Sequence, residues 1–410
     1  MPEASEEPAR RSPGPRFLAT LASISLINPL AVHMFLPALP VVKAAFGISD
    51  ALAGVTFSAT LFVMAFATLA YGSLSDRHGR RPVLLAGLAL FTAGSAASAL
   101  APSVPGLIAA RVVQALGAGC GVTLARAIAR DAYGTERLVK VIAYLTMAYT
   151  LGPMIAPLAG GAIIDLYGWR GVFWFAALAG GVIAATAWAV LHETHPRQGA
   201  AQRSSGFLRD CVALFSHLRF VALVLQTGFS TGTFLSMAAA ASFLMKDYLG
   251  RSGTEFGAYF LLFPTGFLLG NLLASRWSHR FTIESMVLAG SLVTLAAAAA
   301  QSALILSGRV DPLVIFVPGF VMSLAQGLAL PNAQVGAIRV IPGLAGTAAG
   351  IGVFFQMFLG AVFTQAYSFL ADGTPTPMVI TVSSGALLVL AAGTVPFALG
   401  GGFRGARAAR

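Results

Sequence analysis

The sequence predicts an all-α, polytopic membrane protein with twelve transmembrane helices arranged in two six-helix bundles. Of its 410 residues, 57% are hydrophobic and 10% are charged, whereas a soluble domain carries about 25% charged residues. Twelve apolar segments are long enough to cross a hydrocarbon core of roughly 30 Å. These segments are expected to be helices, because a helix satisfies its own backbone hydrogen bonds in lipid.

Short connections separate most of the apolar segments, and the longest connection, residues 192–219, divides six segments from six. The predicted organisation is therefore an N-terminal tail (1–16), a first bundle (17–191), a linker (192–219), a second bundle (220–399) and a basic tail (400–410). The predicted spans are Phe17–Leu36, Ala51–Tyr71, Val83–Ala101, Gly106–Ala127, Val139–Ile164, Gly171–Leu191, Phe220–Met245, Phe256–Ala274, Ser285–Leu306, Leu313–Val335, Leu344–Phe369 and Pro377–Leu399.

The distribution of positive charge predicts the orientation in the membrane. If the N-terminus is cytoplasmic, the outer connections hold few of the 26 Lys and Arg residues, and most of the rest lie inside. Cytoplasmic loops carry such an excess, so we expect both termini, the linker and the basic tail in the cytoplasm. The net charge of +11 then reflects topology, and nucleic-acid binding is not expected because no soluble basic module is present. The predicted outer cations are Lys43, Arg170, Lys246, Arg251 and Arg309.

Arg111 lies inside the fourth predicted span, where a charge is unusual. A charged side chain at mid-helix costs about 2.5–3.5 kcal/mol on insertion scales, so it suggests a function. Gln114 shares its helix face, since positions i and i+3 are neighbours. Because the apolar segments contain no Asp or Glu, a cavity lined by Arg111 would favour neutral or anionic ligands. Alternatively, backbone carbonyls hold Arg111 for structure alone, or it snorkels outward.

The connection between spans two and three reads GSLSDRHGRRP, residues 72–82. It resembles the signature loop of the major facilitator superfamily, and a weaker copy, residues 270–280, follows span eight. The resemblance implies a cytoplasmic latch in which the acid faces the positive N-terminus of span eleven, around residues 343–347. This contact would break when the protein opens inward; the alternative is a merely basic loop. The predicted latch residues are Gly72, Asp76, Arg77, Gly79, Arg80 and Arg81.

Span five contains a glycine–proline pattern that resembles a motif of the superfamily's proton-coupled exporters. We expect a bent, small-faced helix that packs against the other half and limits leakage, or else an ordinary kinked helix. The residues are Gly152, Pro153, Pro157, Gly160 and Gly161.

Further stretches resemble the bicyclomycin/chloramphenicol-type (Bcr/CflA) drug exporters, and the likeness covers both halves, roughly residues 17–400. It implies efflux of drugs driven by proton antiport across a bacterial inner membrane. The stretches are residues 34–40, 126–131, 168–174, 192–194, 330–333 and 345–347.

The sequence departs from this family at His33, where an acid is usual. An imidazole has an ordinary pKa of about 6.5, so His33 is the candidate proton carrier, and we expect it near Arg111. The alternative is a hydrogen bond to a neighbouring helix. Tyr149, Gln226 and Asn332 are further candidates for substrate contact, although such groups usually join helices.

No pattern of catalysis, cofactor binding or metal ligation is found in the sequence, so an enzyme is not expected. The expected partners are a small-molecule substrate, protons and the lipid bilayer, with the chain acting as a monomer. Two other functions stay open: a uniporter or importer of a small organic anion, and a non-transporting receptor or scaffold with the same fold.

Overall fold

The computed structural model describes residues 14–194 and 206–399, and this part of the chain is helical throughout apart from its turns. Twelve of its helical segments are long and apolar enough to cross a membrane, which confirms the predicted fold class. The basic tail and the middle of the linker (195–205) lie outside the described residues, as does all of the N-terminal tail before residue 14.

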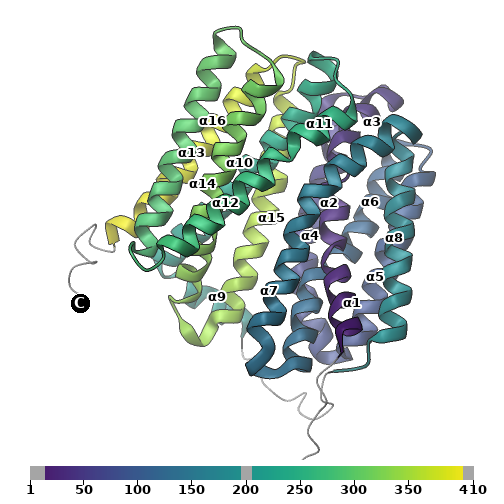
Figure 1. The fold of residues 1–410 in the computed structure, drawn as a ribbon, viewed down its shortest axis with the longest axis vertical. Helices are drawn as coiled ribbons and strands as arrows, with labels where there is room; N and C mark the ends of the chain where they lie inside the picture. Colours follow the sequence, from purple (N-terminus) through teal and green to yellow (C-terminus); the bar gives the residue numbers. More distant parts are fainter. Residues whose placement is uncertain (1–13, 195–205, 400–410) are drawn as a thin grey trace, which may run out of the picture.

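The first half begins with a broken span and contains one very long helix (Figure 1). Residues 15–46 form the first span in several pieces, because the prolines at 37 and 40 cannot donate to an α-helical ladder. The predicted loop between spans four and five is helical instead, since α7 runs for 48 residues through both spans. The elements are α1 (Pro15–Ser25), α2 (Ile27–Val32), η1 (Leu36–Ala38), α3 (Leu39–Phe46), α4 (Asp50–His78), α5 (Arg80–Leu100), α6 (Val104–Ala118), α7 (Cys120–Tyr167) and α8 (Trp169–Val190).

The second half follows a short helix in the linker, α9, which lies at the lower end of Figure 1. Six spans follow it, and the eighth span is bent between α11 and α12. The elements are α9 (Phe207–Phe215), α10 (Leu218–Phe243), η2 (Leu244–Tyr248), α11 (Gly253–Phe260), α12 (Leu262–Trp277), α13 (Ile283–Leu306), α14 (Pro312–Ile338), η3 (Pro342–Leu344), α15 (Ala345–Leu370) and α16 (Thr376–Leu399).

The predicted loop at 72–82 is reduced to a single residue. Helix α4 continues to His78 and α5 starts at Arg80, so Gly79 alone makes the turn. Its φ of 92° lies where a side chain would be strained, which explains the glycine. The signature residues therefore sit on two rigid helix ends and not on a flexible loop.

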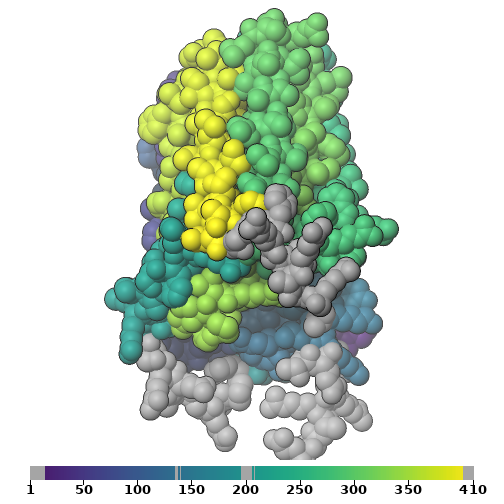
Figure 2. Space-filling view, turned by 90° about the vertical axis from the view of Figure 1, so that its left-hand side faces the viewer, coloured from purple at the N-terminus to yellow at the C-terminus, as the bar shows by residue number. Residues whose placement is uncertain are grey.

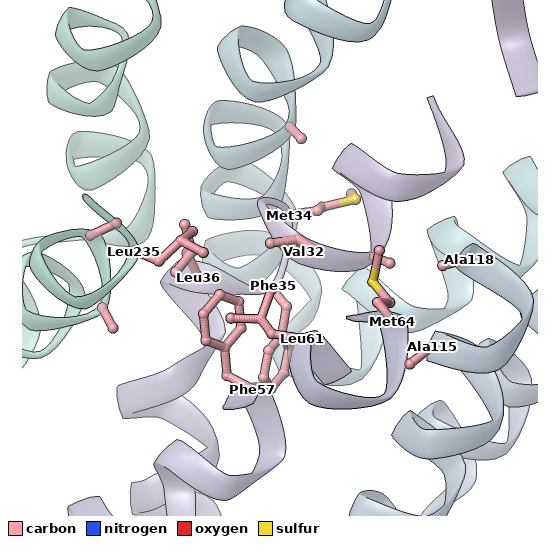
Figure 3. Packing of buried hydrophobic residues seen from close by; sticks show 14 of the residues in the cluster. Val32, Met34, Phe35, Leu36, Phe57, Leu61, Met64, Ala115, Ala118 and Leu235 are labelled. Atoms are coloured by element: carbon pink, nitrogen blue, oxygen red, sulfur yellow. The ribbon is translucent and has the colours of Figure 1, made fainter. Parts of the chain in front are cut away.

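Two helix pairs join the halves. Helix α4 packs along α15, and α7 packs against α11, as Figure 1 shows near its centre. The α4–α15 contact is partly aromatic, since the ring of Phe66 lies 5.1 Å from that of Phe354. Figure 3 shows Leu235 of α10 beside Leu36 of the first span, within one buried cluster that crosses the interface.

The outer faces of the bundles are apolar. Figure 2 shows α13 and α16 side by side on one face of the second half. Exposed side chains of these helices include Leu292, Leu387 and Ile380, at 50%, 57% and 50% exposure. Such a surface is suited to lipid, because a membrane protein meets acyl chains where a soluble protein meets water.

Candidate functional site

Arg111 is enclosed within the first half and is 0% exposed. Its Nε donates to the carbonyl of Thr56 on α4 at 3.1 Å, and its Nη1 donates to the carbonyl of Ala31 on α2 at 3.0 Å. Nη1 also donates to Oε1 of Gln114 at 2.5 Å, which confirms that these two residues share a helix face. The guanidinium carbon lies 4.3 Å from the ring centroid of Phe35. These contacts tie three helices together.

This geometry corrects the expectation that Arg111 lines an accessible central chamber. The amide of Gln114 donates to Ser95 Oγ on α5 at 2.8 Å, so the pair points into the first bundle. The Arg111 guanidinium is bonded to backbone carbonyls and stacked on rings, which is the structural alternative considered for it. No substrate can reach the side chain in this conformation.

His33 lies at the interface between the halves. It is 9% exposed, and its ring centroid is 6.4 Å from that of Phe260 on α11. Its Nδ1 is buried without a hydrogen-bond partner. Among the described residues no hydrogen bond joins His33 to Arg111. Arg111 binds the carbonyl of Ala31, two residues before His33, while the imidazole contacts the opposite half.

The other predicted polar residues are dispersed. Gln226 is 1% exposed inside the second bundle, where its Nε2 lies 3.5 Å from Ser291 Oγ and its Oε1 lacks a partner. Asn332 donates to the carbonyl of Leu328 on its own helix at 2.8 Å. Tyr149 is half-buried on α7. Within the described ranges, no hydrogen bond links these three residues to one another, so they do not form one site in this conformation.

Arg126 is a cation whose role the sequence reasoning did not single out. It lies towards the C-terminal end of the fourth span and is exposed. Among the described residues it forms no ion pair. The sequence could have identified Arg126, because it is a second charge in the same predicted apolar segment, fifteen residues after Arg111.

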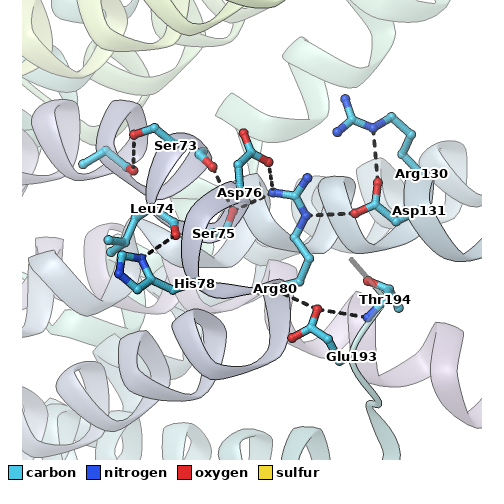
Figure 4. A network of polar contacts seen from close by, with 12 residues as sticks. Ser73, Leu74, Ser75, Asp76, His78, Arg80, Arg130, Asp131, Glu193 and Thr194 are labelled. Atoms are coloured by element: carbon cyan, nitrogen blue, oxygen red, sulfur yellow. Dashed lines mark hydrogen bonds and ion pairs between the residues drawn. The ribbon is translucent and has the colours of Figure 1, made fainter. Parts of the chain in front are cut away.

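The signature residues at the turn between α4 and α5 bind the first half itself (Figure 4). Arg80 is almost fully buried, with its Nη1 2.6 Å from Asp76 Oδ1 and its Nε 2.8 Å from Asp131 Oδ2. Glu193 accepts the backbone N–H groups of Arg80 and Arg81 at 3.0 and 3.1 Å. A carboxylate at the start of α5 is favourable, because the first N–H groups of a helix lack partners within the helix.

The expected contact with span eleven is not made in this conformation. The Asp76 side chain is 57% exposed, and in the described structure no hydrogen bond or ion pair joins it to residues 343–347. A Cβ added at Gly343 or Gly346 would meet nothing within 4 Å. Arg80 forms its ion pairs with Asp76 and Asp131 of the first half, and within the described residues it forms none with the second half.

Near the other end of α4, polar contacts join the two halves. Lys43 Nζ lies 2.8 Å from Asp50 Oδ1 and 2.9 Å from Asp247 Oδ2 of the second half. Ser242 Oγ donates to the carbonyl of Leu36 at 2.6 Å. These ends are linked by polar contacts, whereas no hydrogen bond or ion pair among the described residues joins Asp76 to span eleven.

The span-five pattern packs in two directions. A Cβ at Gly152 would lie 2.4 Å from Pro29, and one at Gly160 would lie 2.4 Å from the carbonyl oxygen of Met34. Both neighbours belong to the first half, so Gly152 and Gly160 pack within their own bundle. The carbonyl oxygen of Pro157 instead faces α11, since a Cβ at Gly257 would lie 2.7 Å from it. Gly161 alone of the three glycines packs against the second half, where a Cβ would lie 2.0 Å from the carbonyl oxygen of Gly253. Pro153 and Pro157 lie inside α7.

The sequence matches the model of the Major Facilitator Superfamily over residues 21–365. The chain therefore belongs to this superfamily of membrane transporters, which agrees with its twelve spans and signature turn.

Within the superfamily, the chain is similar to proteins named for drug resistance. It is 25% identical to the bicyclomycin resistance protein homolog of Haemophilus influenzae over 373 residues, 90% of this chain and 92% of that protein. It is 31% identical to multidrug resistance protein MdtL of Escherichia coli over 264 residues, 62% of this chain and 67% of MdtL.

Solved structures with the same fold are more distant in sequence. A bacterial homolog of the human lysosomal transporter Spinster has a TM-score of 0.75 at 18% identity and covers 94% of this chain and 96% of its own. A D-xylose–proton symporter has a TM-score of 0.74 at 16% identity and covers 91% and 96%. These structures support the fold alone.

Proposed function

We propose that this protein is a secondary active exporter of small drug-like molecules, driven by protons and working by alternating access. The observation that carries the proposal is the relationship to the two drug-resistance proteins, one of which spans both halves of the chain. We place the protein in a bacterial inner membrane as a monomer, with both termini and the linker in the cytoplasm, because the positive charge is concentrated at that side.

Polar contacts link the two halves at one end, and none among the described residues joins the signature acid to span eleven at the other, which supports an alternating-access cycle. The outer ends are bonded through Lys43 and Ser242, and the inner acid Asp76 is free of span eleven. We therefore interpret the conformation as inward-facing. In the outward-facing state, Asp76 would bind the N-terminus of span eleven, and Gly72, Arg77, Gly79, Arg80 and Arg81 would support that latch.

His33 is the residue we propose for proton transfer. It lies between the halves, and its Nδ1 is buried without a partner, so a proton bound there would change the charge at the surface that must separate. Moving one charge down a membrane potential supplies about 2.3 kcal/mol per 100 mV. This proposal needs no contact between His33 and Arg111.

The substrate preference we propose remains neutral or anionic, but it rests on a different cation. Arg111 is fully buried, whereas Arg126 is exposed and Tyr149, on the same helix α7, is half-buried. An unpaired cation within a span is costly unless it faces water or a ligand. We propose that Arg126 and Tyr149 meet the substrate from the cytoplasm, and that Gln114 stays a packing partner of Arg111.

Import or uniport of a small organic anion is the second candidate. It is favoured by the imidazole at position 33, where the related exporters usually carry an acid, since an imidazole gives a transporter no fixed negative site for a cationic drug.

Everted membrane vesicles containing the protein test both candidates. Energised vesicles are given a panel of neutral and anionic drugs, and intravesicular pH is followed with a fluorescent dye. Export predicts substrate uptake into the vesicles together with proton release from them. His33→Ala should abolish this exchange. The control His217→Ala, at an exposed cytoplasmic residue, should leave it intact. Substrate flux without proton movement would favour uniport. A receptor or scaffold would move no compound of the panel.

A further inference from the structure

Asp165 of the first half caps a helix of the second half. Its Oδ1 accepts the backbone N–H of Gly253 at 3.0 Å, and its Oδ2 accepts the N–H and the hydroxyl of Thr254 at 2.8 and 2.6 Å. These two residues begin α11, where helix N–H groups lack partners within the helix. A carboxylate is also favoured there by the positive end of the helix dipole.

The sequence around Asp165 repeats the spacing of the inner signature. Gly161, Asp165, Gly168 and Arg170 are separated by the same intervals as Gly72, Asp76, Gly79 and Arg81. Both second glycines have positive φ, 72° at Gly168 and 92° at Gly79, and each is the only residue between two long helices.

The superfamily fold explains why the repeated motif would lie on the opposite face of the membrane. Each six-helix half contains two three-helix units with inverted topology, so span two and span five are equivalent helices that end on opposite faces of the membrane. By the same relation, spans eleven and eight are equivalent in the second half. An acid at the end of span two that faces span eleven thus has its counterpart in an acid at the end of span five that faces span eight.

The two acids differ in their present contacts. Asp76 is 57% exposed and pairs with Arg80 of its own half, whereas Asp165 is engaged across the interface. Backbone contact accompanies the engaged acid, because a Cβ at Gly161 would lie 2.0 Å from the carbonyl oxygen of Gly253.

We propose that Asp165 is an outer latch, the inverted counterpart of the inner signature acid. It holds the outer ends of the halves together by capping α11, with Lys43 between Asp50 and Asp247 as a second link. In the outward-open state, Asp165 no longer caps α11, and Asp76 caps the N-terminus of α15. The inference rests on alternating access in the proposed function, and it does not depend on the substrate or on proton coupling.

The test measures the separation of the outer ends without any substrate. Spin labels are attached at Leu100→Cys on α5 and Leu306→Cys on α13, which are exposed outer helix ends of the two halves, in a chain whose native cysteines are replaced. Double electron–electron resonance in lipid nanodiscs then gives the ratio of long to short distances. We expect Asp165→Asn to raise this ratio about tenfold, a usual size for conformational coupling.

Asp311→Asn is the matched control. Asp311 caps α14 at an outer end through the N–H groups of Leu313 and Val314, at 2.8 and 3.0 Å, but it does so within one half. This variant should leave the distance ratio unchanged. Thr254→Val, which removes only the hydroxyl bond, should shift the ratio in the same direction by about threefold and tests the latch even where Asp165→Asn folds poorly.

Three results would overturn the proposal. An equal change in the distance ratio for Asp165→Asn and Asp311→Asn would make Asp165 an ordinary helix cap. Thr254→Val could leave the ratio at the wild-type value. Asp165→Glu, which keeps the charge, could fail to restore the short distance in a protein that folds. Because no drug or proton gradient is present, failure of the export proposal would appear in vesicles and not in these distances.

Discussion

Replacing Arg111 distinguishes a structural role from a substrate-binding role. The side chain is 0% exposed and bonded to Thr56, Ala31 and Gln114. We expect Arg111→Ala to destabilise the first bundle and to leave the substrate affinity of the folded protein unchanged. The reason is that the arginine joins α2, α4 and α6, and no open surface reaches it.

The size of the effect follows from these contacts. A hydrogen bond to a charged group contributes about 1.5–3 kcal/mol, and a desolvated cation–π contact such as that with Phe35 contributes about 2 kcal/mol. Burial of the charge opposes these gains by several kcal/mol. Arg111→Ala loses these contacts and leaves Gln114 Oε1 buried without its donor, at about 1–3 kcal/mol. It also removes the cost of burying the charge, so we expect a net loss of about 3 kcal/mol.

Thermal unfolding in detergent and ligand binding together provide the assay. A loss of that size should lower the melting temperature by on the order of 5 °C. Arg111→Lys should recover part of it, because an ammonium keeps the charge but cannot donate to all three acceptors in the same geometry.

Arg126→Ala is the control, since Arg126 lies in the same span but is exposed. This variant should change the stability by less than about 0.5 kcal/mol while weakening the binding of an anionic substrate. The reasoning is refuted if Arg111→Ala melts like the wild type and loses binding, or if Arg126→Ala is the variant that melts early.

Three further variants test the transport cycle. Asp76→Asn should lower the turnover rate more than it raises the KM for transport, because the acid acts in a conformational step; equal transport kinetics would exclude the inner latch. His33→Gln should remove the pH dependence of transport measured between pH 5.5 and 8, a range set around the ordinary imidazole pKa of about 6.5, and an unaltered profile would assign His33 to packing. Gly161→Val should disfavour closure of the outer ends, since its Cβ would lie 2.0 Å from a carbonyl oxygen, whereas Gly352→Val, with nothing within 4 Å, should not; labelling of an outer cysteine reports the difference.

The sequence was sufficient for the fold class, because the signal is local. An apolar stretch that must cross about 30 Å of hydrocarbon is readable from consecutive residues, and the described part of the chain contains twelve such helices. The signature turn was also readable, since Gly79 adopts a φ of 92° that favours glycine. The predicted domain boundaries and the tails stay predictions.

The sequence predicted where the helices lie better than it predicted what each helix face contacts. The spacing of Arg111 and Gln114 placed them together correctly, but it did not say whether they face a central cavity or the interior of one bundle. Likewise, no hydrogen bond joins His33 to Arg111 among the described residues, and the imidazole ring contacts Phe260 of the other half. A helical period fixes which residues share a face, and it leaves the rotation of that face to the neighbouring helices.

The tertiary structure alone decided the contacts between residues far apart in the chain. Asp165 binds the start of α11 eighty-eight residues later, and Arg80 binds Asp131. The Asp165 contact depends on how the two halves meet, and the Arg80–Asp131 contact depends on how helices pack within the first half. The residues of this protein thus determined twelve membrane helices by composition and length, whereas packing between distant helices determined which charges are sealed, exposed or joined across the interface.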